Sequence, residues 1–183
     1  MNAPHDVRDI ARREPAHLPG RDFGRHTDTV EHVASLLEAS AVERDRAGGT
    51  AWAERQLLRD SGLLTLAVPT GFGGAGLPWP ELYAIIRRFA EADSSLAHLF
   101  GFQHLQVASV RLFANPDQQA RLLGGTVSEG WFWGNATNGL DTRISLTAEG
   151  DHFVLDGIKS FCSGATGSDM LNVTAPRGSD PAD

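Results

Sequence analysis

The chain has 183 residues, of which 41% are hydrophobic and 21% charged, with a formal net charge of -7. This balance is typical of a folded globular protein of one or two domains, not of a disordered or fibrous chain. The Lys and Arg residues are dispersed along an acidic chain, which argues against a nucleic-acid partner. No run of 18 apolar residues occurs, so we expect no membrane partner. The single cysteine, Cys162, excludes an intrachain disulfide and indicates a cytoplasmic setting.

Prolines and a glycine interrupt residues 1–24, which we expect to form a flexible lead-in. Hydrophobic residues at three-to-four spacing then predict a series of helices. The fourth of these is apolar nearly all round, so it should be central and buried. The expected helices span residues 26–46, 50–60, 80–92, 95–113 and 117–123, with Thr50 as the cap of the second and Pro80 at the start of the third.

After Gly124 and Gly125 the hydrophobic pattern changes from helical spacing to alternation, which predicts short strands. The expected strands span residues 131–135, 143–149, 152–155, 158–162 and 170–175. The fold class is therefore α+β, with a helical N-terminal domain at residues 25–125 and a partial β domain at residues 126–183. Because so few short strands leave sheet edges open, we expect the chain to be the N-terminal part of a longer protein.

Residues 71–76, GFGGAG, satisfy the dinucleotide-binding pattern G-x-G-x-x-G. In that motif the last glycine opens a helix within a βαβ unit. Here the sequence LPWP follows instead, and Asp93 closes a helix where the motif needs the end of a strand. We therefore interpret the segment as a tight turn between two helices.

The histidines do not form a metal motif, because no pair is spaced at i, i+4 and no cysteine or acidic cluster accompanies them. His98 and His104 are six residues apart on one helix and should point to different faces. Cys162 is a candidate nucleophile by composition, but a small buried thiol packed against the sheet is the more frequent situation. No G-x-S-x-G segment supports a serine hydrolase.

Two glycine-punctuated runs, residues 131–141 and 156–164, place aromatic side chains beside small hydroxyl or amide residues. Such a mixture suits a flat ligand with a polar edge, because the aromatic ring covers a ring face and the short polar side chains reach the edge. Trp133 and Phe161 are the aromatic candidates. In the predicted strand at residues 158–162 and just beyond it, Phe161 and Ser163 would share one face. The alternative is that both are ordinary sheet residues.

Several segments in this order resemble the acyl-CoA dehydrogenase superfamily. Residues 62–77, GLLTLAVPTGFGGAGL, are similar to its GLL and GGAGL loop, and residues 91–97, EADSSLA, to its A-D-x-S-x-A passage. Residues 156–159, DGIK, resemble the tetrapeptide that precedes its flavin-binding Trp-Ile-Thr or Trp-Ile-Ser. Here residues 161–163, FCS, stand at that tripeptide, and residues 135–141, NATNGLD, stand at the family's T-E-P-x-A-G-S-D. These departures resemble the branch of dibenzothiophene monooxygenase-like and sulfur-acquisition flavin monooxygenases.

The resemblance implies a helical domain, the start of a β-barrel-like middle domain, and a C-terminal four-helix bundle that this chain lacks. It also implies that Asn135 and Ser163 hydrogen-bond the flavin edge while Phe161 packs on its face, with Trp133 as a further cofactor contact. His98 would be the catalytic acid or base, assisted by Ser163, although a structural histidine is the alternative. Phe102 stands where the branch often has tyrosine.

The expected function is that of a flavin-dependent oxidoreductase: a monooxygenase that uses reduced FMN and O2 on a small organosulfur or related compound. The resemblance leaves FAD open as the cofactor. It also leaves open an acyl-CoA dehydrogenase that oxidises a thioester, and a truncated flavin-binding fragment without activity. A flavin reductase is an expected partner, and the full-length protein is expected to form a homo-oligomer.

Overall fold

The computed structural model describes residues 23–176. Helices occupy its first two thirds and short strands the remainder. The helices are α1 (Thr27–Ala47), α2 (Trp52–Asp60), α3 (Trp79–Ala92), α4 (Ser94–Phe113) and α5 (Pro116–Ser128), with single 3-10 turns at Gly24–His26, Leu63–Thr65 and Thr70–Phe72. The strands are β1 (Trp133–Ala136), β2 (Ile144–Glu149), β3 (His152–Gly157) and β4 (Met170–Val173).

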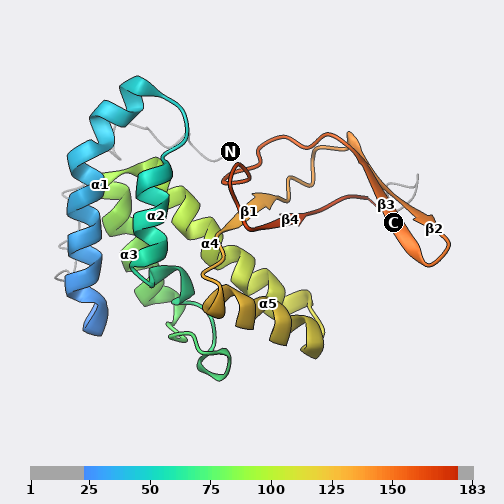
Figure 1. Ribbon diagram of the computed structural model, residues 1–183, viewed down its shortest axis with the longest axis horizontal. Coiled ribbons are helices and arrows are strands. Elements are labelled where there is room, and N and C mark those ends of the chain that lie inside the picture. The colour runs from blue at the N-terminus through green and yellow to red at the C-terminus, as the bar shows by residue number, and fades with distance from the viewer. Residues whose placement is uncertain (1–22, 177–183) are drawn as a thin grey trace, which may run out of the picture.

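Helix α4 is the centre of the molecule, as its apolar composition predicts. It packs between the group formed by α1, α2 and α3 and the strand β1, with α5 beside its C-terminal half (Figure 1). Asp93 caps α4, because its carboxylate accepts a hydrogen bond of 2.8 Å from the amide of Leu96. Leu96, Phe100 and Val107 are fully buried on this helix, so α4 is held in place on most sides.

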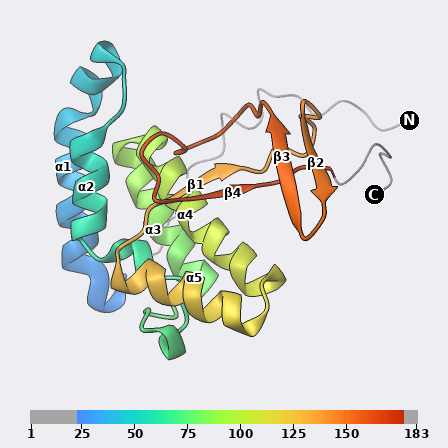
Figure 2. The ribbon, with the colours of Figure 1, turned by 45° about the vertical axis from the view of Figure 1, so that its right-hand side comes forward.

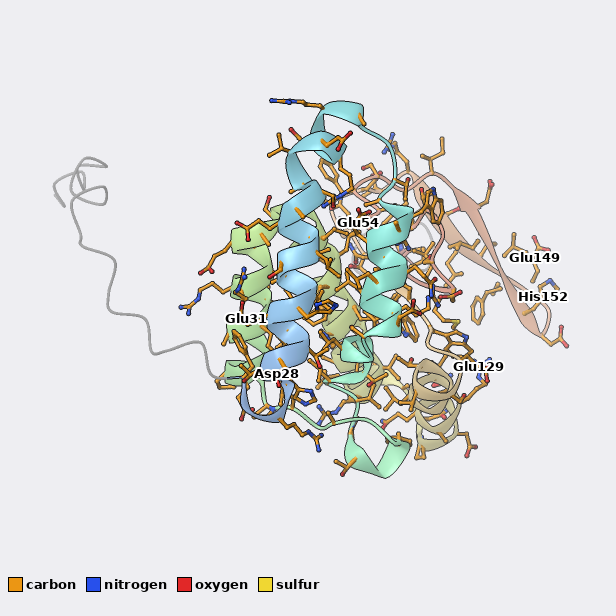
Figure 3. The ribbon with its side chains drawn as sticks, turned by 60° about the vertical axis from the view of Figure 1, so that its left-hand side comes forward. Asp28, Glu31, Glu54, Glu129, Glu149 and His152 are labelled. Atoms are coloured by element: carbon orange, nitrogen blue, oxygen red, sulfur yellow. The ribbon has the colours of Figure 1, made fainter. Side chains whose placement is uncertain are left out.

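Ion pairs connect the helices at their edges. Arg44 of α1 reaches both Glu54 of α2, at 2.9 Å, and the capping residue Asp93, at 2.8 Å. Figure 3 shows Glu54 at the level where α1 and α2 lie side by side. Arg88 of α3 pairs with Glu31 of α1 at 2.9 Å. The Arg44 contacts fix the start of α4 relative to the helices that precede it.

The strands form two separate pairs. β1 and β4 pair in parallel, with Asn135 opposite Asn172, and lie against α4. β2 and β3 form an antiparallel hairpin that projects away from the helices (Figure 2). Glu149 and His152 are at its far tip (Figure 3), and every residue of β3 is exposed. The α+β fold class predicted from the sequence is confirmed.

The strand predicted at residues 158–162 is wrong. β3 continues to Gly157, which pairs with Ile144, and the chain then leaves the ladder. The physical reason is that the carboxylate of Asp141 accepts hydrogen bonds from both the amide and the hydroxyl of Ser160, each at 2.7 Å. Phe161 follows with φ of 57°, a left-handed conformation that regular strand residues do not adopt.

Two helix ends also differ from expectation. Thr50 is not the cap of α2, whose preceding residue is Ala51 and whose start has no side-chain cap. α5 begins at Pro116 and continues through Gly124 and Gly125 to Ser128. The glycine at 125 is required for packing, since a Cβ there would lie 2.3 Å from the ring of Trp131. Glycine here permits a close approach instead of ending the helix.

The loop of residues 71–76 is a tight turn between two helical segments, as predicted. A Cβ at Gly74 would lie 2.1 Å from the carbonyl oxygen of Val68, and Gly73 and Gly76 have φ of 88° and 63°. The predicted lead-in at residues 1–24 lies almost entirely outside the described residues. Within residues 23–176, no helix is both long and apolar enough to cross a membrane.

Candidate functional site

One face of α4 carries polar and aromatic side chains at four-residue intervals, His98, Phe102 and Gln106. His98 lies at the outer end, where its Nε2 is 2.9 Å from Oγ of Ser163. Its imidazole also packs on the ring of Phe102, with ring centroids 4.5 Å apart. The hydroxyl and the aromatic contact together orient His98, although the residue is exposed.

Asn135 and Ser163 lie side by side. The backbone amide of Asn135 donates to the carbonyl oxygen of Ser163 at 2.9 Å. This bond joins the middle of the loop after β3 to strand β1. Because His98 contacts the same serine through its side chain, three residues from three segments meet at one place. The fold thus brings His98, Asn135 and Ser163 together.

Two hydrogen bonds orient the side chain of Asn135. Its Oδ1 accepts from Nε2 of Gln106 at 3.2 Å and from the hydroxyl of Thr137. Its Nδ2 has no hydrogen-bond partner within residues 23–176, and it is not among the fully buried atoms. Asn135 as a whole is only 6% exposed. A donor group with some solvent contact therefore remains on Asn135, next to Ser163.

A hollow of about 440 Å³ lies over the His98–Ser163 pair, lined also by Ser94, Ser95 and Leu99. A second hollow of about 1180 Å³ shares Ser94, Ser95 and Leu99 with it and extends toward α1 and α2. Ligand pockets in proteins commonly measure about 300–1,000 Å³. The lining of the smaller hollow combines three hydroxyls, an imidazole and an apolar wall. It can accommodate a planar ligand with hydrogen-bonding edges.

Phe161 lies in the same loop as Ser163 but not on a strand, so the predicted same-face alternation is wrong. Its ring is 82% exposed, which is unusual for a phenylalanine. Its left-handed backbone, with φ of 57°, is a conformation that bulky residues adopt only where the surrounding structure requires it. An exposed aromatic ring two residues from Ser163 is available to cover a flat ligand.

The ring of Trp133 is turned away from the hollow. Its side chain is buried, and Nε1 donates to the hydroxyl of Thr126 in α5 at 2.9 Å. Its backbone amide donates to Oε1 of Gln103 at 2.7 Å. Trp133 thus anchors the start of β1 on α4 and α5, and its indole does not reach His98 or Ser163.

Asp141 is a residue of this region that the sequence analysis did not select. Its carboxylate accepts from the amide and hydroxyl of Ser160 and from two guanidinium nitrogens of Arg143, each of these at 2.8 Å. Hydrogen bonds from Arg143 and Ser160 hold the pKa of Asp141 well below its usual range. Because Asp141 therefore stays charged, its hydrogen bonds to Ser160 hold the loop that carries Phe161 and Ser163 in place. The sequence signal was present, since Asp141 stands at the aspartate of the T-E-P-x-A-G-S-D pattern.

The remaining candidates lie elsewhere. Cys162 is half-buried, donates from Sγ to the carbonyl of Lys159 at 3.3 Å, and lines only the larger hollow. His104 is fully buried, and neither ring nitrogen makes a well-formed hydrogen bond within residues 23–176; burial lowers its pKa to about 3, against a smaller raising effect of the Leu63 backbone. Within residues 23–176 no group of three or more His, Cys, Asp and Glu side chains could hold a metal ion.

Comparison with known proteins identifies the family. Residues 26–130 match the model of the acyl-CoA dehydrogenase N-terminal domain. The probable FMNH2-dependent monooxygenase SfnC of Pseudomonas putida is 50% identical over 80% of this chain and 37% of its own length. Methanesulfinate monooxygenase MsuC from Pseudomonas fluorescens superposes with a TM-score of 0.81 at 48% identity, covering 84% of this chain and 40% of that one.

A third relative was crystallised with its ligands. The dibenzothiophene monooxygenase TdsC from Paenibacillus sp. A11-2, in complex with FMN and indole, gives a TM-score of 0.81 at 42% identity. The match covers 87% of this chain and 41% of TdsC. This chain therefore spans about two fifths of the length of the relatives it matches. By its matched domain, its fold and these relatives, the chain belongs to the acyl-CoA dehydrogenase family.

Proposed function

We propose that this chain supplies one wall of the flavin site of a monooxygenase that uses reduced FMN and O2 to oxidise a small organosulfur compound. The observation that carries the proposal is the hydrogen bond between His98 and Ser163 at the hollow, with Asn135 tied to the same serine. The relatives SfnC, MsuC and TdsC support it, because their names and structures record FMNH2 dependence, methanesulfinate or dibenzothiophene oxidation and bound FMN.

The residues at and beside the hollow fit an isoalloxazine ring, with Ser163 in its lining and Asn135 and Phe161 next to that serine in the fold or the chain. The open Nδ2 of Asn135 and the hydroxyl of Ser163 can hydrogen-bond its polar edge, and the exposed ring of Phe161 can cover a face. When bound, reduced flavin supplies the electrons that activate O2. Trp133 contributes by holding β1 and with it the backbone of Asn135, and not through its indole.

His98 is the proton-handling residue of the proposal. Its Nε2 is hydrogen-bonded to Ser163 Oγ, and the imidazole is the member of the pair that can gain or lose a proton at the hollow. The aromatic contact with Phe102 keeps the imidazole facing the serine. In this arrangement Ser163 orients and His98 donates or accepts the proton as oxygen is transferred to the substrate.

An acyl-CoA dehydrogenase is the second candidate, and the family match over residues 26–130 is the observation that favours it. The relatives SfnC, MsuC and TdsC favour the monooxygenase instead, because at 42–50% identity all three are named monooxygenases. We therefore favour oxygen transfer.

The test replaces the segment of MsuC that matches this chain with residues 23–176. The chimera is assayed with reduced FMN from a flavin reductase, O2, and methanesulfinate or dibenzothiophene. We expect oxygen-dependent product and a loss of at least tenfold in the same chimera carrying Ser163→Ala. A folded chimera that binds FMN but yields no product contradicts the proposal, as does acyl-CoA-dependent bleaching of an electron acceptor.

Three further elements belong to the proposal. FMN is the cofactor in preference to FAD, and a reductase that regenerates it is a partner in the cytoplasm. The full-length protein forms a homo-oligomer. Leu112 and Phe113, 76% and 85% exposed at the end of α4, support a further covering surface there.

A further inference from the structure

Two asparagines face one buried glutamine beneath the candidate site. Asn135 of β1 and Asn172 of β4 are paired positions in the parallel ladder, so their side chains lie on the same face of the strands. Gln106 of α4 lies opposite both of them and is 1% exposed. Helix and strand pair are therefore connected at this level by amide side chains and not by apolar contacts.

The hydrogen bonds of this cluster run in one direction. Nδ2 of Asn172 donates to Oε1 of Gln106 at 2.7 Å, and Nε2 of Gln106 donates to Oδ1 of Asn135 at 3.2 Å. The hydroxyl of Thr137 donates to the same Oδ1. A carbonyl oxygen has two lone pairs, so both acceptor positions of Asn135 are occupied. Its Nδ2 is left without an acceptor within residues 23–176.

We propose that Gln106 is a positioning residue that fixes Asn135 as a hydrogen-bond donor, so that the site recognises an acceptor atom on the edge of the bound flavin. The inference rests on the proposed function for the identity of the ligand. An unrestrained asparagine amide can turn over and offer either its oxygen or its nitrogen at similar positions, because the two ends have nearly the same shape. The hydrogen bonds from Asn172 through Gln106 couple the three amides, so that Asn135 cannot turn over unless Gln106 and Asn172 turn with it.

Neither Gln106 nor Asn135 is part of the lining of the smaller hollow, so Gln106 acts on a ligand there only through Asn135, which adjoins the lining residue Ser163. Removing one bond of a buried amide chain leaves a polar group unsatisfied, which is unfavourable enough to determine the orientation of its neighbour. The backbone amide of Asn135 is also held by Ser163, so the side chain can only rotate and cannot move away. The donor is thus fixed in both position and chemical character.

The ligand-free 183-residue chain allows a test that does not need activity. Hydrogen exchange of the side-chain amides, followed by NMR, distinguishes the two directions of the chain. We expect slow exchange for the NH2 of Asn172, which is hydrogen-bonded, and fast exchange for the NH2 of Asn135. Slow exchange at Asn135 and fast exchange at Asn172 would mean that the chain runs the other way, and would overturn the inference.

Two variants should reverse the direction of the hydrogen bonds among Asn172, Gln106 and Asn135. In Asn172→Asp the new carboxylate cannot donate, so Gln106 turns its Nε2 toward it and presents Oε1 to Asn135, which turns over. Gln106→Glu removes the donor facing Asn135 and has the same result, which covers the case that the first variant does not fold. In both, the NH2 of Asn135 should become slow to exchange. Thr174→Asp, which adds a carboxylate at an exposed position next to β4, is the control.

FMN titration then connects orientation with binding. Loss of one well-formed hydrogen bond weakens binding by about tenfold, so both reversing variants should lower FMN affinity by about that factor, and Thr174→Asp should not. Unchanged affinity in a variant whose Asn135 amide has turned over would refute the donor role. If the wild-type chain binds no FMN, the proposed cofactor fails, whereas the exchange rates still decide whether Gln106 orients Asn135.

Discussion

His98 Nε2 and Ser163 Oγ lie 2.9 Å apart although 65 positions separate them in the chain. Helix α4 presents the imidazole at the hollow, and the loop after β3 brings the hydroxyl to it. The contact depends on the loop, because no strand continues there. Both partners face the hollow, so they are available to a ligand and to each other.

The first prediction concerns this pair. Ser163→Ala should weaken FMN binding about tenfold, because a hydrogen bond to the ligand is lost. The free energy of unfolding should change by less than about 1 kcal/mol, since the hydroxyl is only half-buried. FMN titration and urea denaturation measure the two effects. Ser109→Ala, which removes a hydroxyl from the same helix as His98, is the control.

The pair should also be coupled. His98→Leu combined with Ser163→Ala should reduce FMN affinity by less than the product of the single effects, because each single change already breaks the shared hydrogen bond. Strict additivity in the double-mutant cycle would show that the two side chains act independently.

The second prediction concerns Asp141, which holds the loop at Ser160. Asp141→Ala should release residues 160–164, so their backbone amides should exchange faster with solvent and FMN binding should weaken. Hydrogen exchange with mass spectrometry measures the first effect. Asp151→Ala, at the exposed tip of the hairpin, should change neither. Unchanged hydrogen exchange of residues 160–164 in Asp141→Ala would show that Asp141 does not hold this loop.

The third prediction is a pH dependence of stability. Burial lowers the pKa of His104 from 6.5 to about 3. Between these values the unfolded chain binds a proton that the folded state does not. The free energy of unfolding should therefore fall as the pH drops below about 6.5, by up to about 1.4 kcal/mol per pH unit.

Urea denaturation at several pH values tests the role of His104. In His104→Leu this part of the acid sensitivity should disappear, whereas His32→Gln, at an exposed position of α1, should retain it. Parallel pH profiles for the wild type and His104→Leu would contradict the assignment to His104.

The fourth prediction separates two glycines of one loop. Gly74→Ala should lower the free energy of unfolding by about 3 kcal/mol, because the added Cβ would lie 2.1 Å from the carbonyl oxygen of Val68. Gly71→Ala should have little effect, since within residues 23–176 nothing beyond its own turn comes within 4 Å of its Cβ position. Thermal or chemical denaturation of the two variants compares them directly. Equal effects would show that the loop can shift to accommodate the methyl group.

The amino-acid sequence by itself determined the helical part of this protein. Hydrophobic periodicity predicted α1 and α4 closely, because local spacing reports which face of a helix is buried. The turn at residues 71–76 was predicted correctly, because the sequence LPWP follows its last glycine where a dinucleotide-binding motif would start a helix. The family was recognisable from short segments in order, and the matched domain confirms it.

Only the tertiary structure decided the details of the site. Asp141 removes Ser160 from the expected strand through hydrogen bonds across the chain, and no local propensity reports such a contact. The orientation of Asn135 depends on Gln106 and Asn172, which belong to a helix and a strand far apart in sequence. Periodicity identifies which side chains are buried. Which buried amide donates to which is a property of the assembled fold, because hydrogen-bond direction depends on all the partners together.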